Sequence, residues 1–227
     1  MKYLIIGLGN FGSSLAQLLT ETGHEVIAVD SEFHMVDALK GKVTHAICLD
    51  CTDPQAVATL PLKDTDTAIV CIGENEGANL LATALMKQMK VRRLISRAVS
   101  PLHKTILEAM DIHDIIQPEE ESAQRWAKKL NLVGVIDSFD LSAEYSIVEA
   151  AVPLRLIGKT LAELQLGPNY NILVLTTIKI VVKRNILGTE GRKREIQPVA
   201  TASTILEADD ILVIYGNKKD ITRLLNG

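Results

Sequence analysis

The first 131 residues alternate short runs of branched apolar residues with amphipathic segments, and this alternation constrains the fold more than any other feature. Continuously apolar strands are covered on both faces, which is typical of a parallel sheet joined by crossover helices. We therefore predict an α/β, doubly wound sheet. Its strands are expected at Lys2–Ile6, Glu25–Val29, His45–Leu49, Thr67–Ile72, Arg93–Ser96 and Asp114–Gln117. Its helices are expected to begin near Phe11, Glu32, Pro54, Glu76, Pro101 and Glu119.

The pattern changes after about residue 132. Strands are expected at Ser146–Val152, Ile172–Thr176, Ile178–Val182 and Ile211–Tyr215, with short helices at Leu161–Leu164 and Asp220–Leu225. This mixture predicts a smaller C-terminal α+β domain. We place the boundary in the stretch 132–142, so that the N-terminal domain covers 1–135 and the C-terminal domain covers 136–227.

Composition narrows the function classes. Hydrophobic residues make up 47% of the chain and charged residues 23%, which is typical of a globular protein. The net charge of −4 disfavours binding to nucleic acid or to an anionic membrane. The N-terminus is predicted to be a buried strand and not a signal peptide, and Ile172–Val182 is too short and too polar to span a bilayer. We therefore expect a cytoplasmic protein that meets the membrane only through a partner.

A glycine-rich motif follows the first expected strand directly and reads Gly7-Leu8-Gly9-Asn10-Phe11-Gly12. In a GxGxxG motif the three glycines permit a tight turn, a close backbone approach to pyrophosphate, and close packing of helix on strand. Asp30 ends the second strand at the expected distance from the glycine motif. A carboxylate there accepts hydrogen bonds from ribose hydroxyls and repels a 2′-phosphate. The pattern predicts a Rossmann-like site for ATP, ADP or NAD(H), and disfavours NADP. A glycine turn used only for packing is the alternative.

Other residues at the carboxyl ends of the strands are expected to complete this site, because ligands bind at that edge of such sheets. They are Ser31, Asp50, Cys51, Thr52, Ile72, Gly73, Asn75 and Arg97. The guanidinium of Arg97 offers a fork of donors to phosphate oxygens. Pairing of Arg97 with a carboxylate is the alternative.

An acidic run, Glu119–Glu121, lies where the last helix of the N-terminal domain begins. Carboxylates there are commonly partners of the helix dipole, and Glu119 is the candidate ligand for a divalent cation that bridges phosphates. Further along the helix, four residues repeat at helical spacing: Ala123, Trp126, Ala127 and Leu130. They predict a packed face, with a subunit interface as the alternative.

Two further groups of residues have simple interpretations. Cys48, Cys51 and Cys71 are expected to be reduced, small, buried side chains and not a redox or metal site. The basic segment Arg184–Glu195 is expected to be an exposed hairpin loop with solvated charges, because Gly188 and Gly191 lie within it. Contact with a small anion or a partner is its alternative.

Several segments together resemble a known family. They are the glycine motif, AVD ending at Asp30, LDCTD at Leu49–Asp53, IQPEEE at Ile116–Glu121, LSAEYSIVE at Leu141–Glu149, and the closing DDILVIYGNKKDITRL. These residues are similar to the RCK domains (regulators of potassium conductance) of Ktr- and Trk-type potassium-uptake regulatory subunits. The resemblance covers nearly the whole chain.

This resemblance implies a regulatory subunit at the inner face of the cell membrane, bound to a membrane potassium transporter. It implies homo-oligomers, in which dimers assemble into a ring and adenine nucleotides or NAD(H) change the ring and gate the pore. By position, Asp30 would hold the ribose, Asp50 would lie by the adenine and Arg97 would reach a phosphate. Glu119 would be the cation ligand, and the helix of Trp126 would cross between neighbours.

Two details depart from this pattern. Close Ktr relatives carry an arginine where this chain has Asn10, so selectivity for a terminal phosphate is in doubt. Some family members bind cyclic di-AMP in the C-terminal domain. Asn171, Ile172 and Pro198 match that site in part, but a basic residue expected nearby has no clear counterpart.

Other functions remain open. A small NAD-dependent oxidoreductase shares the glycine motif, but hydride transfer needs a placed acid or base. All five histidines lie in the first half, so the second half assembles no catalytic group of this kind, and we expect no enzyme. A nucleotide-sensing regulator of another partner, such as a transcriptional regulator, would use the basic residues between Lys179 and Arg194, yet no helix-turn-helix pattern accompanies them.

Overall fold

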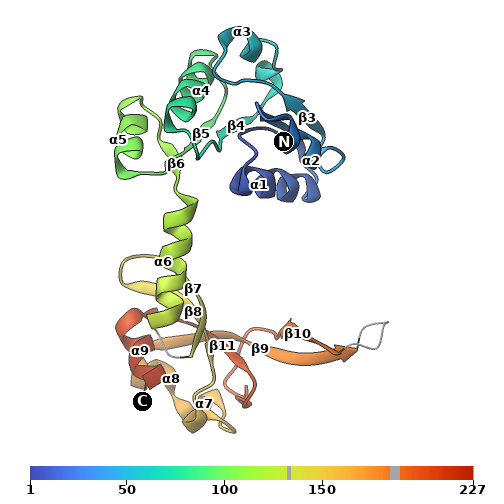
Figure 1. Ribbon diagram of the computed structural model, residues 1–227. Helices are drawn as coiled ribbons and strands as arrows, with labels where there is room; N and C mark the ends of the chain where they lie inside the picture. Colours follow the sequence, from blue (N-terminus) through green and yellow to red (C-terminus); the bar gives the residue numbers. More distant parts are fainter. Residues whose placement is uncertain (132–133, 185–189, 227) are drawn as a thin grey trace. The chain divides into compact units, whose positions relative to one another are not determined.

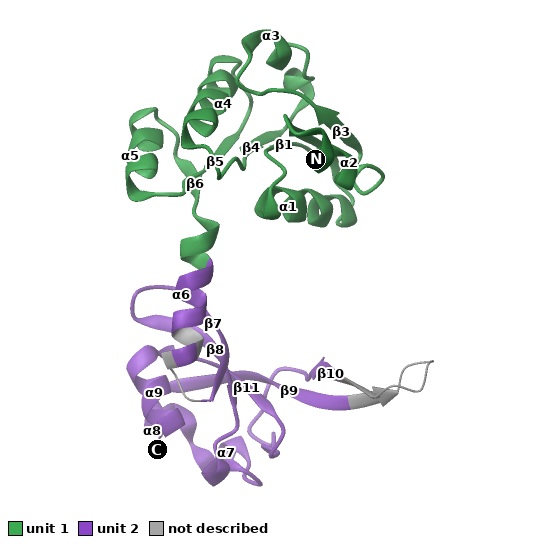
Figure 2. Ribbon diagram, in the orientation of Figure 1, with its two compact units in different colours: residues 1–121 green, residues 122–227 purple. Residues whose placement is uncertain are grey.

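The protein consists of two compact units, seen in a computed structural model that describes residues 1–131, 134–184 and 190–226 (Figures 1 and 2). The first unit covers Met1–Glu121 and the second covers Ser122–Gly227. Helix α6, Pro118–Asn131, contains the point of division. In the described ranges no helix is both long enough and apolar enough to cross a bilayer.

The first unit is a six-stranded sheet in which every neighbouring pair is parallel. Its strands are β1 Lys2–Ile6, β2 Glu25–Asp30, β3 His45–Cys48, β4 Thr67–Val70, β5 Leu94–Arg97 and β6 Asp114–Ile116. The order β3-β2-β1-β4-β5-β6 is that of a Rossmann-like sheet, as predicted. Its helices are α1 Asn10–Glu21, α2 Phe33–Leu39, α3 Pro54–Val57, α4 Glu76–Gln88 and α5 Pro101–Ala109, with a 3₁₀ turn at Leu62–Asp64.

Both faces of this sheet are buried, which explains the continuous apolar runs of its strands. Side chains alternate along a strand, so Leu4 and Ile6 of β1 pack in one cluster and Ile5 packs in the other. The first cluster includes Met86 of α4, and the second includes Ala16 of α1. Crossover helices therefore cover both faces and leave the carboxyl ends of the strands at one open edge.

The second unit is a five-stranded sheet whose neighbouring strands are all antiparallel. Its strands are β7 Val135–Asp140, β8 Tyr145–Ala151, β9 Ile172–Arg184, β10 Glu190–Ile196 and β11 Ile211–Asn217, in the order β10-β9-β11-β8-β7. Its helices are α7 Leu161–Leu164, α8 Leu166–Tyr170 and α9 Lys218–Asn226, with a 3₁₀ turn at Leu154–Leu156. Alternate residues of the sheet pack with these helices in one apolar core. The predicted α+β character is confirmed.

Three features of the second unit differ from the sequence predictions. The two strands predicted at Ile172–Thr176 and Ile178–Val182 are one strand, β9. Its pairing with β11 shifts register at Leu175, which has no partner, and the strand continues past this irregularity. The predicted loop Arg184–Glu195 is largely β10, paired antiparallel with β9, while 185–189 lie outside the described residues. Strand β7 occupies most of the stretch 132–142, of which 132–133 are also outside the description. The boundary between functional domains stays a prediction.

The repeating residues of α6 are exposed in the part of the chain that the structure describes. Trp126 is 61% exposed and Leu130 is 79% exposed, and Ala123 and Ala127 are exposed too. This exposure does not support the predicted packed face, and the alternative of a subunit interface stays a prediction. Helical periodicity alone does not distinguish a face that packs within a chain from one that meets another chain.

Candidate functional site

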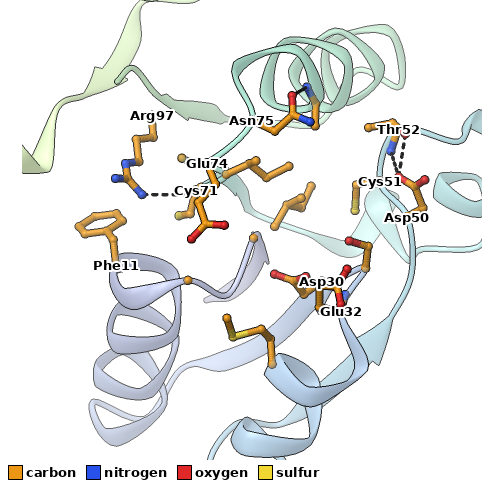
Figure 3. A pocket seen from close by; sticks show the side chains of 18 of the residues that line it. Phe11, Asp30, Glu32, Asp50, Cys51, Thr52, Cys71, Glu74, Asn75 and Arg97 are labelled. Atoms are coloured by element: carbon orange, nitrogen blue, oxygen red, sulfur yellow. Dashed lines mark hydrogen bonds between the residues drawn. The ribbon is translucent and has the colours of Figure 1, made fainter. Parts of the chain in front are cut away.

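A cavity of about 510 Å³ lies at the carboxyl ends of the strands on both sides of β1 (Figure 3). Strands β2 and β3 lie to one side of β1, and β4 to β6 lie to the other, so this is the point where the strand order reverses. Dinucleotides bind at this point in doubly wound sheets. The volume falls in the range of small-molecule sites, roughly 300–1,000 Å³.

The three glycines of the motif have distinct structural roles. Gly7 has a φ of +92°, and a Cβ there would lie 2.8 Å from the Ile72 backbone nitrogen. A Cβ at Gly12 would overlap the carbonyl oxygen of Gly7, so the helix could not pack this close to the turn. A Cβ at Gly9 would have no described neighbour within 4 Å. Gly7 and Gly12 shape the turn, whereas the space above Gly9 is open.

Helix α1 begins at this open space. Gly9 is its N-cap and brings no side chain, so among the described residues no side chain caps the first turn. By contrast α3, α4 and α5 are capped by the side chains of Asp53, Asn75 and Ser100. Uncapped first-turn N–H groups and the positive end of the helix dipole together favour an anion.

Asp30 ends β2 beside the turn and is held by two backbone groups. The Leu8 N–H donates to its Oδ2 at 2.7 Å and the Glu32 N–H donates to its Oδ1 at 2.9 Å. The carboxylate therefore links the glycine motif to the start of the next loop. Each oxygen keeps a lone pair for a ligand hydroxyl.

The end of β3 contributes another carboxylate to the cavity. The backbone N–H and the hydroxyl of Thr52 both donate to Oδ1 of Asp50, at 2.8 and 2.7 Å. These bonds lower the pKa of Asp50, so it stays charged at neutral pH. In Figure 3 Asp50 and Thr52 lie on the far side of the cavity from Phe11 and Arg97.

Two of the three cysteines are buried, as predicted, and Cys48 is exposed, contrary to the prediction. Burial raises the pKa of the Cys51 thiol to about 12, with the Asp50 and Asp30 charges adding to the effect. Burial also raises the pKa of Cys71 to about 12, although Arg97 opposes it. Cys48 is exposed because it closes β3, the strand at the edge of the sheet. The two buried thiols stay protonated and unreactive at neutral pH.

Arg97 ends β5 on the other side of β1 and its side chain is 13% exposed. Its Nη2 donates to Oε1 of Glu119, and its Nη1 donates to the Cys71 carbonyl at 3.3 Å. Its Cζ lies 5.9 Å from the centre of the Phe11 ring. The buried Nε has no partner among the described protein atoms. The alternative prediction, pairing with a carboxylate, describes Arg97 in this structure.

A buried polar network supports this side of the cavity from below. The Asn79 amide nitrogen donates to the carbonyls of Ile72 and Arg97, at 2.9 and 3.1 Å, so it bridges the ends of β4 and β5. Its Oδ1 accepts from the Ser96 hydroxyl at 3.0 Å and lies 3.2 Å from His103 Nε2. Asn79, Ser96 and His103 are all fully buried. The network sets the spacing of two strand ends that line the site.

Two family models match the chain: the TrkA-N domain over residues 3–118 and the TrkA-C domain over residues 146–226. The Ktr system potassium uptake protein C of Bacillus subtilis is 32% identical over 222 residues, which are 98% of this chain and 95% of that protein. This chain belongs to the RCK family of Ktr and Trk potassium uptake proteins. The Ktr system potassium uptake protein A of Vibrio alginolyticus is 30% identical to this RCK protein, over 99% of the chain and 96% of that protein. The predicted family is confirmed.

Solved RCK structures share the fold. The GsuK RCK domain matches with a TM-score of 0.62 at 16% identity, over 100% of this chain and 48% of that one. The GsuK channel bound to NAD matches with a TM-score of 0.59 at 16% identity, over 100% of this chain and 39% of that one. At this identity the likeness shows the RCK fold alone.

The cavity of this RCK protein brings together nearly all the residues predicted for a nucleotide site. Gly12 is the exception, because it packs beneath the turn. The lining residues that the sequence analysis did not name for the site are Ile6, Glu32, Met35, Leu49, Cys71, Glu74 and Ala78. Most of them flank predicted site residues in the loops after β2, β3 and β4, so a wider window around each strand end would have found them.

Glu119 lines the cavity and pairs with Arg97. Within the described part of the RCK chain, no group of three or more His, Cys, Asp or Glu side chains is arranged to hold a metal ion. A cation at Glu119 would therefore need further ligands from a bound nucleotide or from water. The role of Glu119 as a cation ligand stays a prediction.

Proposed function

We propose that this chain is a cytoplasmic, nucleotide-sensing regulatory subunit of a potassium uptake system, and not an enzyme. The observation that carries the proposal is the uncapped N-terminus of α1, which faces a cavity whose ribose-accepting carboxylate, Asp30, is already in place. A phosphate and a ribose of one ligand would satisfy both groups.

The proposed ligand is an adenosine nucleotide, ATP or ADP, or NAD(H). The Asp30 carboxylate favours a ribose with a free 2′-hydroxyl, which disfavours NADP. The solved GsuK channel bound to NAD supports this ligand class, because it shares the fold. Asp50 and Thr52 are proposed to lie by the adenine, and Arg97 to reach a phosphate.

Several observations support a role without catalysis. Among the described residues that line the cavity, none is histidine, lysine or tyrosine, and its two buried thiols stay protonated. The described lining therefore lacks histidine, the side chain that most often transfers protons in catalysis. The named relatives are potassium uptake proteins, which also supports a regulatory subunit.

The proposed partner is a membrane potassium transporter of the Ktr or Trk type, so the chain is peripheral at the inner face of the membrane. The exposed Trp126 and Leu130 on α6 support a homo-oligomer in which dimers form a ring. Nucleotides would act by binding one arrangement of subunits better than another, since a ligand that binds both equally shifts nothing. A divalent cation at Glu119, and cyclic di-AMP near Asn171, Ile172 and Pro198, remain proposals of the same kind.

The test is isothermal titration with ATP, ADP, NAD⁺, NADH and NADPH on the wild-type chain and on Asp30→Ala and Gly9→Ala. We expect an affinity in about the micromolar range for at least one adenosine ligand, weakened about tenfold or more in both variants, without turnover. Gly9→Ala is a clean probe because its Cβ meets no described atom within 4 Å, so it blocks pyrophosphate without disturbing the fold. Absence of binding to every ligand would overturn the proposal.

The regulatory part has a separate test. Small-angle scattering of the oligomer, with and without each bound nucleotide, measures whether the arrangement of subunits changes. We expect at least two ligands to give different scattering curves. Identical curves for all ligands would overturn the gating mechanism and leave nucleotide binding in place.

A further inference from the structure

The cavity is strongly acidic for a site that is proposed to hold phosphates. Among the lining residues that the structure describes, the charged side chains are five carboxylates and a single guanidinium: Asp30, Glu32, Asp50, Glu74, Glu119 and Arg97. Carboxylates repel phosphates, although water and salt screen the exposed ones, which are Glu32, Asp50, Glu74 and Glu119. The identity of the ligand therefore depends on where these carboxylates lie along it.

Glu74 is the carboxylate that the nucleotide motif does not explain. It follows β4 and immediately precedes Asn75, the N-cap of α4. In Figure 3 its side chain points into the cavity, which Phe11, Arg97 and Cys71 also line. Within the described part of the chain, no hydrogen bond or ion pair holds the Glu74 side chain, and the residue is exposed. Its charge is therefore available to a ligand.

The positive charge on this side of the cavity is already balanced. The Arg97 guanidinium donates to Glu119 and to the Cys71 carbonyl. The motif contributes the neutral Asn10 at the start of α1. Glu74 thus adds a negative charge that no described cation offsets. The first-turn N–H groups of α1 still favour binding of a phosphate, but the space beyond them disfavours a second negative group.

A doubly wound sheet has two mononucleotide-binding halves related across the reversal point. Asp30 and Asp50 lie in the half of β2 and β3, where the adenosine is proposed to bind. Glu74 lies in the half of β4, on the other side of β1 from Asp30 and Asp50. ADP and ATP would direct their terminal phosphates towards Glu74. NAD⁺ would instead keep both phosphates at α1 and direct its positively charged nicotinamide towards Glu74.

We propose that Glu74 is a specificity-determining residue that makes this site selective for NAD⁺ over nucleoside di- and triphosphates. This inference rests on the proposed nucleotide site and names the ligand class that the site takes. The expected order of affinity follows the charge on the ligand's distal part: NAD⁺ binds more tightly than NADH, and ADP more tightly than ATP. NADH lies between NAD⁺ and ADP, because its dihydronicotinamide is neutral.

The experiment is isothermal titration with NAD⁺, NADH, ADP and ATP, without divalent cations, on the wild type and on Glu74→Gln. The wild type is expected to bind NAD⁺ about tenfold or more tightly than ATP. Glu74→Gln is expected to tighten ATP about tenfold, while NAD⁺ weakens or is unchanged. Raising the salt from about 0.05 M to about 0.5 M should narrow the wild-type difference, since salt screens exposed charges.

Glu76→Gln is the matched control, because Glu76 is an exposed carboxylate two residues away that does not line the cavity. Glu76→Gln should change neither the affinity for ATP nor the affinity for NAD⁺. The inference is overturned if the wild type binds ATP as tightly as NAD⁺, or if Glu74→Gln and Glu76→Gln have equal effects on ATP. Binding that depends on Asp30 and shows no such preference overturns this inference alone. Absence of binding to all four ligands, in the wild type and in Glu74→Gln, overturns the nucleotide site itself.

Discussion

The two units differ in which side chains they bury and which they expose. The first unit buries polar side chains directly beneath its cavity, and two of their buried atoms, Arg97 Nε and His103 Nδ1, have no described partner. The second unit carries a row of exposed and half-buried apolar side chains across its sheet, away from its core. The row runs through paired positions of β7, β8, β11 and β9: Phe139, Ile147, Tyr215 and Leu173. Phe139 is 66% exposed and Leu173 is 58% exposed.

This difference teaches what each unit has to bind. A buried polar network is tolerated where it fixes the geometry of a site for a small polar ligand. An exposed apolar row is tolerated where another protein surface covers it. We therefore propose that the first unit binds a small polar ligand and that the second unit meets another protein surface.

The largest expected effect is on the glycine turn of the first unit. Gly12→Ala would put a methyl group onto the backbone carbonyl of Gly7, and backbone yields less easily than a side chain. We expect the free energy of unfolding of the first unit to fall by about 3 kcal/mol or more, measured by urea denaturation. Gly9→Ala is the control and should leave this free energy nearly unchanged. Equal losses in the two variants would contradict the assigned roles.

The next prediction compares the stability contributed by a buried polar side chain in each unit, beginning with Asn79 in the first. Asn79→Ala removes the bridge between β4 and β5 and leaves the Ile72 and Arg97 carbonyls without their donor. We expect a loss of about 2 kcal/mol in the first unit and a weaker nucleotide affinity. Hydrogen exchange of β4 and β5 amides measures the loss locally.

The counterpart in the second unit is Ser146→Ala. The Ser146 hydroxyl is also buried, but its bonds to the Phe139 and Ile147 carbonyls are long, at 3.3 and 3.2 Å. We expect a loss below about 1 kcal/mol in the free energy of unfolding. A larger loss for Ser146 than for Asn79 would break the comparison between the units.

A fourth prediction uses pH. Burial lowers the pKa of His103 below its usual 6.5, against an opposing effect of the Glu76 charge. The unfolded chain therefore takes up this proton first, so the stability contributed by neutral His103 is complete above pH 6.5 and is lost as pH falls towards the folded-state pKa. We expect hydrogen-exchange protection of the first unit to decrease between pH 7.5 and pH 5.5, after correction for intrinsic exchange rates.

The second unit provides an internal control for this measurement, because all five histidines lie between residues 24 and 113. Its protection should change less over the same pH range. His103→Gln should remove most of the difference between the two units. If that variant keeps the full pH dependence, the effect belongs to the other histidines.

The last prediction concerns a local effect in the second unit. Thr160 and Glu163 form a capping box at the start of α7, in which the Thr160 N–H donates to Glu163 at 2.8 Å. Thr160→Ala should lower the free energy of unfolding by about 1 kcal/mol, with no change in nucleotide affinity. Titration calorimetry and urea denaturation of the same sample measure both. A change in affinity would show that the second unit influences the site.

The sequence predicted the first unit far better than the second. The strands of the first unit are buried on both faces and read as unbroken apolar runs, and its helices begin at recognisable residues such as Pro54 and Pro101. In the second unit the sheet is covered on one face, so β10, with its many charges, looked like a loop. Its pairing partner, β9, is what makes it a strand.

The residues of the site could also be predicted only in part. Residues that act through local geometry, such as Gly7 and Asp30, could be predicted from motif and spacing. Asn79 and His103 could not, because their roles depend on strands and helices brought together only by folding. The pairing of Arg97 with Glu119 was one of two readings, and choosing between them required the structure.

Gly73, the residue after Ile72, limits which side chains relatives of this protein can combine at positions 73 and 97. A Cβ at Gly73 would lie 2.5 Å from Nη1 of Arg97, and that nitrogen is the far end of a flexible side chain. A larger residue at position 73 would push the guanidinium aside and leave the fold intact. Positions 73 and 97 are therefore expected to change together among relatives, so that arginine at one is accompanied by glycine at the other.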